Sequence, residues 1–319
     1  MIGSMTAGVQ AMSSFVKGIE VIGNNISNIN TVGYKGSTTR FEDAFSNTLQ
    51  RGTGNTGLGS NSITQQIGTG TKIATIKTQF AQGSLQTTGG LSDLGLSGEG
   101  FFRVRDTLQG LEYVTRAGDF RVDDQGYLVT NTGFRVQGLG LAADDTKAVF
   151  SAGDPSGAVD YSSLRDIRID YRSATATGGP RLETFQIDQG GNVNIFLSNG
   201  QSMVRGKVLL QRFQDTGALV KEGDNLYSGI ADAGPTEPWP ATRTSGSASA
   251  AFATATDYQA LSAAQNGNGR VISGSVEMSN VDLTNEFANM ITTQRAFQAA
   301  SKLITTSDEI LQDIVNLKR

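Results

Sequence analysis

The chain has 319 residues with 40 Gly and only 5 Pro, a length that allows two or three domains. It carries 26 Lys and Arg against 30 Asp and Glu, a formal charge of -4, so no basic surface indicates a nucleic-acid partner. Because it contains neither Cys nor His, thiol and imidazole catalysis, disulfides and the common zinc sites are excluded.

Large apolar residues recur every three or four positions at the N-terminus, including Met5, Val9, Met12, Val16 and Ile19. This period predicts an amphipathic helix over residues 1–30. The segment lacks the charged start and unbroken apolar core of a cleaved secretion signal, and no apolar run of the chain reaches membrane-spanning length. We therefore expect no membrane insertion and, if the protein is exported, a route without a cleaved Sec signal.

An Asn-rich segment follows this helix, with Asn24, Asn25, Asn28 and Asn30 ahead of Gly33. Asn side chains bond to nearby backbone and tolerate left-handed conformations, so this segment predicts the end of the helix and a fixed exit path. The simpler alternative is a helix stop without further purpose. Residues 31–70 are rich in Gly, Ser and Thr, which predicts an extended linker.

The centre of the chain is predicted to be mainly β-structure. Residues 71–140 contain short alternating stretches separated by turn signals, among them 101–105, 113–115 and 134–137, which predicts the first part of a β-domain. Residues 141–201 are less regular, with strands expected at 167–171, 184–187 and 193–197, and are interpreted as a small inserted outer β-domain. Residues 202–268 are expected to hold the second part of the β-domain and a loop rich in Ala, Ser and Gly, whose role the sequence leaves open.

A second long helix is predicted within residues 269–319. Phe287, Met290, Phe297, Ile304 and Leu311 follow a near-heptad spacing, and Asp282 is placed to cap the first turn. Matched terminal heptads favour pairing of the two helices as an α-helical coiled coil, although an ordinary helical hairpin would have the same pattern. The predicted class is therefore an α+β multidomain protein with mainly β central domains.

No motif of the sequence supports a catalytic, cofactor or metal site. Residues 200–207 have the wrong glycine spacing for a phosphate loop, and residues 95–100 precede a strand instead of opening a helix. Asp-Gly turns near Asp124 and Asp188 lack the ligand pattern of a calcium loop. We therefore expect a non-enzymatic structural protein. A carboxylate pair that meets only in space stays open, as does a stalked extracellular enzyme or adhesin.

Six motifs in order resemble those of the bacterial flagellar hook and rod family. They are NNISNINTVGYK at 24–35, QGSLQTTGG at 82–90, SGEGFF at 97–102, TRAGDF at 115–120, DDQGYLV at 123–129 and the run EMSNVDLTNEF at 277–287 with its helical continuation. Within the family, residues 40–49 and 74–84 look most like the hook subunit. The short insertion and residues 210–228 keep the distal rod protein as the alternative.

The resemblance implies a subunit that polymerises into a helical tube on the bacterial flagellum, outside the cell. As a hook, the tube would transmit torque as a flexible joint and conduct exported subunits. The implied partners are further copies of the chain, the distal rod, hook cap and hook–filament junction proteins, and the flagellar type III export apparatus, with no cofactor. Residues expected to serve polymerisation or inner-helix packing are Met5, Val9, Met12, Val16, Ile19, Asn24, Asn25, Asn28, Asn30, Gly33, Ser279, Asn280, Val281, Phe287, Met290, Phe297, Ile304 and Leu311.

Overall fold

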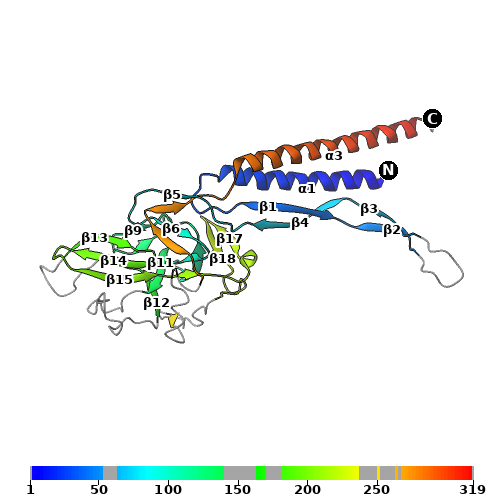
Figure 1. Ribbon diagram of the computed structural model, residues 1–319. Helices are drawn as coiled ribbons and strands as arrows, with labels where there is room; N and C mark the ends of the chain where they lie inside the picture. Colours follow the sequence, from blue (N-terminus) through cyan, green and yellow to red (C-terminus); the bar gives the residue numbers. More distant parts are fainter. Residues whose placement is uncertain are drawn as a thin grey trace. The chain divides into compact units, whose positions relative to one another are not determined.

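The computed structural model divides the chain into two compact units (Figure 1). The first, here called the terminal unit, comprises Met1–Ile29, Lys35–Gln79 and Val281–Arg319. The second, here called the sheet unit, comprises Asn30–Tyr34 and Phe80–Asn280. The structure describes residues 2–52, 63–139, 163–169, 181–236, 250–251, 263–264 and 267–317.

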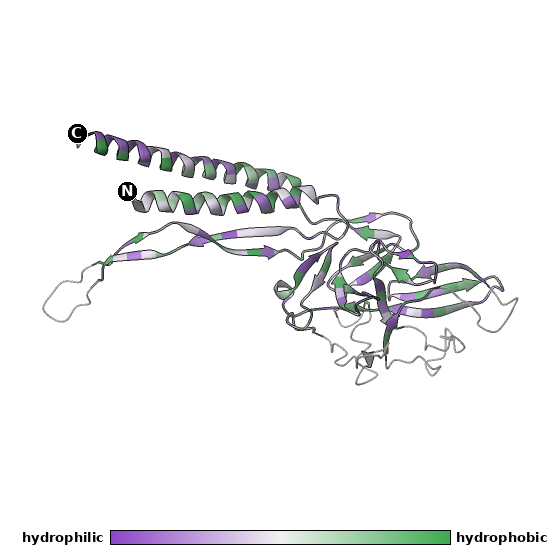
Figure 2. Ribbon diagram, turned by 180° about the vertical axis from the view of Figure 1, so that it is seen from behind, coloured by the Kyte–Doolittle hydropathy of each residue, from purple (hydrophilic) through white to green (hydrophobic). Residues whose placement is uncertain are grey.

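Two helices run side by side in the terminal unit, α1 (Ile2–Ser27) and α3 (Leu283–Leu317) (Figure 1). The predicted cap of α3 is confirmed, because Asp282 Oδ1 accepts a hydrogen bond from the Thr284 amide at 2.9 Å. Glu286 places a carboxylate in the first turn, where the helix dipole favours negative charge. Figure 2 shows apolar and polar residues alternating along both helices, as the sequence period requires.

A β-ribbon completes the terminal unit. Strand β1 (Ser37–Asp43) pairs antiparallel with β4 (Thr71–Thr78), and β2 (Ser46–Gln50) pairs with β3 (Gln65–Gly68). The structure thus differs from the extended linker expected over residues 31–70. Strand pairing satisfies the backbone polar groups, and the β-branched Thr and Ile residues of these segments suit extended backbone. Residues 53–62 of the expected linker lie outside the described part.

The sheet unit is built on a large antiparallel sheet with the strand order β13-β14-β15-β11-β7-β8-β18-β17. The strands expected at residues 101–105, 113–115 and 134–137 are present as β7, β8 and β11. The elements of this unit are β5 (Leu85–Thr87), β6 (Leu94–Ser97), β7 (Phe101–Arg105), β8 (Glu112–Thr115), β9 (Arg121–Val122), β10 (Leu128–Val129), β11 (Arg135–Leu139), β12 (Ser163–Asp166), β13 (Leu182–Ile187), β14 (Asn192–Leu197), β15 (Ser202–Val208), β16 (Leu210–Gln211), η1 (Thr216–Ala218), β17 (Val220–Gly223), β18 (Leu226–Ser228), β19 (Ala250–Ala251), β20 (Arg270–Ser273) and β21 (Ser275–Glu277).

Two strands expected in a separate inserted domain belong instead to the large sheet. Strand β14 pairs with β13 on one side and with β15 on the other, and β15 pairs with β11. Val193, Ile195 and Leu197 alternate along β14 and are buried in the same core as Phe102. The alternation therefore reflects a sheet face packed on the main core, which corrects the expected separation of these strands. Of the strand expected at 167–171, residues 167–169 follow the end of β12 at Asp166, and residues 170–171 lie outside the described part.

The core of the sheet unit lies under this sheet, where Phe102 and Phe120 meet edge to face with ring centroids 5.2 Å apart. A second apolar cluster gathers around Phe101, Phe213 and Tyr227. The architecture as a whole is mostly β-sheet with one N-terminal and one C-terminal helix, in keeping with the α+β class expected from the sequence. Much of the Ala, Ser and Gly-rich loop, at residues 237–249, 252–262 and 265–266, lies outside the described part.

Candidate functional site

The buried face of α3 repeats every seven residues. Met290, Phe297, Ile304 and Leu311 are half-buried on this face, and Ser307 is buried beside them. Ser307 Oγ lies 3.4 Å from Ser4 Oγ of α1. Phe287 behaves differently, because 46% of its surface stays exposed. Of the five large apolar residues predicted on this helix, four therefore lie on or near the buried face.

The buried side of α1 is lined by small residues, which the sequence reasoning missed. Gly8, Ser14 and Gly18 are buried. A Cβ atom on Gly8 would lie 2.9 Å from Ile304 Cγ1, so a side chain at this position would force Ile304 of α3 to shift. The recurrence of Gly and Ser at helical spacing in residues 8–18 was the available signal.

Some large apolar residues of α1 are half-buried, and others are exposed. Met5, Met12 and Ile19 are half-buried, whereas Val9 is 55% exposed and Val16 is also exposed. The structure therefore does not bring this stripe together as one closed seam within the chain. Val9 and Val16, seven residues apart and so on one side of α1, leave apolar surface open to solvent.

Asn25 ties the end of α1 to both of its neighbours in the terminal unit. It is only 2% exposed, and its side-chain amide accepts from the Ser37 amide at 2.9 Å and donates to the Ser37 carbonyl at 2.8 Å. Its Nδ2 also donates to Glu286 Oε1 of α3 at 3.2 Å. Burial raises the pKa of Glu286, and the Asn25 hydrogen bond opposes this shift. One Asn thereby fixes the helix, the ribbon and the second helix together.

The other Asn residues of the segment lie nearer the surface. Asn28 Nδ2 donates to the Asn24 carbonyl at 2.9 Å and to Asn24 Oδ1 at 2.7 Å, which closes the last turn of α1. Asn24 and Asn30 are exposed. These contacts account for the predicted helix end.

Gly33 and the segment before α3 make hydrogen bonds within the sheet unit. Gly33 has a φ of 68°, and its amide donates to the Glu277 carbonyl at 2.7 Å. A Cβ at this position would lie 2.4 Å from the Ala117 backbone nitrogen, so only glycine fits. Asn280 Nδ2 donates to the Ala81 carbonyl at 3.0 Å, and Ser279 is buried. Val281 is half-buried and belongs to the terminal unit.

A buried ion pair in the sheet unit was not predicted from the sequence. Arg116 Nη1 lies 3.2 Å from Glu277 Oε2, and both side chains are almost fully buried. Glu277 Oε1 accepts from the Gly83 amide at 2.8 Å, and Arg116 Nη2 donates to the Gly98 carbonyl at 2.9 Å. Burial lowers the pKa of Arg116, and the neighbouring Glu277 carboxylate opposes this effect. The pair joins residues far apart in the sequence, so no local pattern could reveal it.

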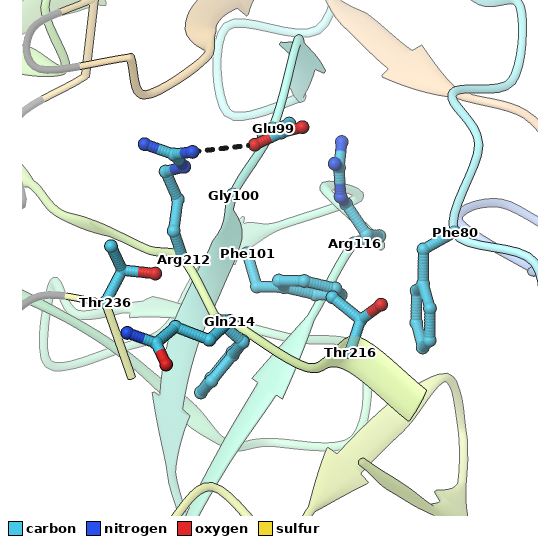
Figure 3. Close-up of a pocket in the computed structure, with 10 residues that line it drawn as sticks. Phe80, Glu99, Gly100, Phe101, Arg116, Arg212, Gln214, Thr216 and Thr236 are labelled. Atoms are coloured by element: carbon cyan, nitrogen blue, oxygen red, sulfur yellow. Dashed lines mark hydrogen bonds and ion pairs between the residues drawn. The ribbon is translucent and has the colours of Figure 1, made fainter. Parts of the chain in front are cut away.

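A pocket of about 520 Å³ opens beside this ion pair (Figure 3). Its apolar lining comes from Phe80, Phe101 and Phe213, and Arg116 lies next to Phe101 with the guanidinium 5.2 Å from the ring centroid. At the rim, Arg212 donates to Glu99 Oε2 at 2.9 Å, drawn as a dashed line in Figure 3. The pocket thus offers an aromatic floor under a charged rim.

The β-ribbon of the terminal unit also exposes large apolar side chains. Phe45 is 69% exposed, and the side chains of Leu49, Ile63, Ile67 and Ile76 are likewise open to solvent. Single exposed apolar residues are common, but five in and beside these strands leave apolar area that a partner could cover.

The described residues contain no group of three or more acidic side chains placed to hold a metal ion. Neither of the two long helices has a stretch apolar enough to cross a bilayer, over the part that the structure describes. The candidate functional features are therefore the exposed apolar surfaces and the pocket.

Three protein-family models match the chain. "Flagella basal body rod protein" matches residues 5–35, "Flagellar hook protein FlgE/F/G D1 domain" matches residues 95–195, and "Flagellar basal body rod FlgEFG protein C-terminal" matches residues 272–317. The matches fall on α1 with the Asn-rich segment, on much of the large sheet, and on α3.

Curated relatives extend this similarity over the whole chain. The flagellar basal-body rod protein FlgG of Bacillus subtilis is 36% identical over 321 residues, covering 100% of both chains. The FlgG protein of Buchnera aphidicola subsp. Baizongia pistaciae is 30% identical over 303 residues, covering 93% of this chain and 92% of the relative. The flagellar hook protein FlgE of Borreliella burgdorferi is 24% identical over 465 aligned residues, covering 100% of both.

Proposed function

Because this chain belongs to the flagellar rod and hook protein family, we propose that it is a rod subunit of the flagellar axial tube. Members of this family are non-enzymatic structural proteins of the bacterial flagellum, and they polymerise with other flagellar proteins in its axial structure. The observation that carries the proposal is the exposed apolar surface of the terminal unit, on Val9, Phe287 and the ribbon residue Phe45. A free subunit has no use for such a surface, but a polymer covers it.

The preference for the rod over the hook rests on length. The FlgG relative matches this chain at 36% identity over 321 residues, close to the 319 of the chain itself. The FlgE relative requires 465 aligned residues, and β13 and β14 lie within the large sheet instead of forming a further domain. The hook remains the second candidate, because residues 40–49 and 74–84 look more like that subunit.

In the assembled tube, α1 and α3 pair as an α-helical coiled coil that forms the inner layer. The residues proposed for helix packing are Met5, Met12, Ile19, Met290, Phe297, Ile304 and Leu311. Val9, Val16 and Phe287 contact neighbouring subunits, and Asn25 holds the angle at which the ribbon leaves α1. A tube needs contacts between unlike surfaces that do not close into a ring, which exposed flanks on both helices supply.

The tube transmits torque from the motor and conducts other exported subunits through its bore. Its partners are further copies of the chain, neighbouring rod and hook proteins, the hook cap and junction proteins, and the flagellar export apparatus. The subunit reaches its place beyond the inner membrane through the flagellar export apparatus. If it is a hook protein instead, the same tube acts as a flexible joint.

Electron microscopy of basal bodies from a deletion strain tests the assignment. If the chain is a rod subunit, basal bodies without it should have a truncated rod and no hook. Complete rods that lack hooks would support the hook assignment instead. Normal rods, hooks and filaments would contradict both.

A paired substitution on α3 tests the proposed assembly surface. Phe287→Asp places a charge on the exposed apolar flank and should abolish tube formation by purified protein. Gln294→Asp adds the same charge at an exposed polar position of the same helix, so it serves as the matched control. Circular dichroism should be unchanged in both variants, because neither side chain is needed for the fold. Tubes of normal yield from Phe287→Asp would show that this flank faces solvent.

A further inference from the structure

A cavity of about 200 Å³ lies within the terminal unit, where α1, α3 and β1 meet. Its lining includes Gly18 and Ile22 of α1, Phe41 of β1, and Glu286 and Asn289 of α3. Phe41 and Asn289 are exposed, so the cavity opens to solvent at their side. Its volume is below the roughly 300 to 1,000 Å³ of pockets for small organic ligands, which favours a single side chain as the occupant.

Glu286 gives this cavity a negative charge that no cation balances. Its Oε1 accepts from Asn25 Nδ2 at 3.2 Å, and no Lys or Arg of the described residues forms an ion pair with it. Burial and the nearby Asp282 carboxylate raise the pKa of Glu286, and the Asn25 hydrogen bond opposes them. A carboxylate in such a place is stabilised by a cation that enters beside it. The cavity therefore fits the charged end of a long basic side chain.

Arg295 lies on the opposite side of α3 from this carboxylate. Nine residues separate it from Glu286, which is about 2.5 turns of an α-helix. Arg295 is exposed, and among the described residues it has no ion-pair partner. It cannot reach Glu286 of its own chain, because the helix stands between the two side chains. Unlike surfaces on opposite sides of one element join copies into an open row.

The surroundings of Arg295 fit the cavity better than those of Lys302, the other cation of α3. Ile291 lies one turn before Arg295 on the same side of the helix and is 57% exposed. Lys302 has the polar Gln298 at the corresponding position. An Arg beside an apolar neighbour can bury its aliphatic stem against an apolar wall such as Phe41 while its guanidinium reaches the carboxylate.

We propose that Arg295 of one copy enters the Glu286 cavity of the next copy and pairs with its carboxylate. This inference rests on the proposed function, because it requires the chain to polymerise. The occupant is a second copy of this chain, since one helix presents both the anionic cavity and the complementary cation. The pair supplies the counter-charge that Glu286 does not find within its own chain.

Neutral substitutions test this pair through the lowest protein concentration at which purified full-length chain forms tubes. Glu286→Gln and Arg295→Gln should each raise this concentration about tenfold, because each leaves one charge of the contact without its partner. The double variant should be no worse than either single variant, since both substitutions remove the same interaction. Glu309→Gln and Lys302→Gln remove exposed charges from the same helix and serve as matched controls with little expected effect.

The stability of the monomer separates an assembly role of Glu286 from a structural one. Glu286→Gln keeps an oxygen that can accept from Asn25 Nδ2, so the helical signal of the monomer should melt no earlier than in the natural chain. Impaired tubes from a monomer that is equally or more stable mean that a contact between copies has been lost. Impaired tubes from a less stable monomer would overturn the assembly role of this carboxylate.

Disulfide trapping locates the contact, because the natural chain contains no Cys. Full-length chain with both Arg295→Cys and Asn289→Cys is assembled at high concentration, oxidised mildly and run on a denaturing gel. Asn289 lines the cavity, so a row of copies should give a ladder of linked chains. Chain with both Lys302→Cys and Asn289→Cys is the control and should give no ladder.

Three results would overturn this contact while the proposed function stands. They are tubes from Arg295→Gln at the natural concentration, additive losses in the double variant, and tubes of the Arg295→Cys and Asn289→Cys chain that yield no ladder. Failure of the natural chain to form tubes under any condition would count against the proposed function as well.

Discussion

The two units of this chain differ in where they keep their large apolar residues. In the sheet unit, Phe102, Leu128 and Val136 are buried within a continuous core. In the terminal unit, the residues buried on α1 are Gly8, Ser14, Gly18 and Asn25, none of them apolar and large, whereas Val9, Phe45 and Phe287 are exposed. The sheet unit thus has its own source of stability, whereas the terminal unit leaves apolar surface for other molecules to cover.

This difference separates folding from assembly within one molecule. A subunit that must exist alone before it polymerises needs one part that is stable without neighbours. In the proposed polymer the other part would gain further burial, so its apparent stability would depend on protein concentration. The substitutions below test this division, beginning with the largest expected effect.

Phe102→Ala should remove about 3 to 5 kcal/mol from the free energy of unfolding of the sheet unit, because it opens a cavity beside Phe120. Chemical denaturation monitored by the circular dichroism signal of the strands measures this loss of stability. Phe45→Ala is the matched control in the terminal unit and should change the monomer by less than about 0.5 kcal/mol. Equal losses of stability from the two substitutions would contradict the difference between the two units.

Arg116→Leu should destabilise the sheet unit by about 3 to 5 kcal/mol, because it removes the guanidinium that pairs with the buried Glu277 carboxylate. Arg212→Leu is the control, since its partner Glu99 is exposed and such pairs contribute about 1 kcal/mol or less. Urea denaturation of both variants decides the matter. If Arg116→Leu unfolds at the natural urea concentration, the pair is not a structural element of this unit.

Asn25→Ala should cost the terminal unit about 1 to 3 kcal/mol, because the Ser37 backbone groups lose their side-chain partner in a buried site. The helical circular dichroism signal should melt earlier, while the sheet unit keeps its stability. Asn30→Ala removes an exposed Asn of the same segment and should change stability by less than about 0.5 kcal/mol. Similar losses of stability from both variants would mean that the Asn content of the segment, and not the hydrogen bonds of Asn25, determines its stability.

Features that depend on neighbouring residues in the sequence could be predicted. The period of Met290, Phe297 and Ile304 and the position of Asp282 specify α3 and its cap, because a helix is a local structure. The alternation of Phe101–Arg105 likewise identifies β7. The strands of the ribbon were missed because their Thr, Ser and Gly content indicated a linker, and pairing between β1 and β4 is not visible in either strand alone.

Features that join distant parts of the chain could not be predicted from local patterns. The alternation of apolar residues along β14 predicts a strand. It does not show that pairing with β15 places this strand in the large sheet. Large apolar residues suggested where α1 would contact α3, whereas the close contact occurs at Gly8, which has no side chain. The contact between Asn25 and Glu286 spans most of the sequence, so the residue type was predicted and its partner was not.

The smallest expected effect concerns the pH dependence of the terminal unit. Burial is the main cause that raises the pKa of Glu286 above its ordinary value of 4.5, with Asp282 adding to the shift and the Asn25 hydrogen bond opposing it. A carboxyl whose pKa is higher in the folded state binds its proton more tightly there than in the unfolded chain. Its contribution to stability is therefore fully present below pH 4.5 and is lost as the pH rises through the raised pKa.

Glu286→Gln removes this titration while keeping an oxygen that can accept from Asn25 Nδ2. The variant should be more stable than the natural chain at neutral pH, by less than about 1 kcal/mol, and the two should converge in acid. Thermal melts of the helical signal across this pH range measure the difference, with Glu309→Gln as the control because that carboxyl is exposed on the same helix. A variant that is less stable than the natural chain at neutral pH would mean that the carboxylate stabilises the terminal unit through Asn25 more than its burial costs.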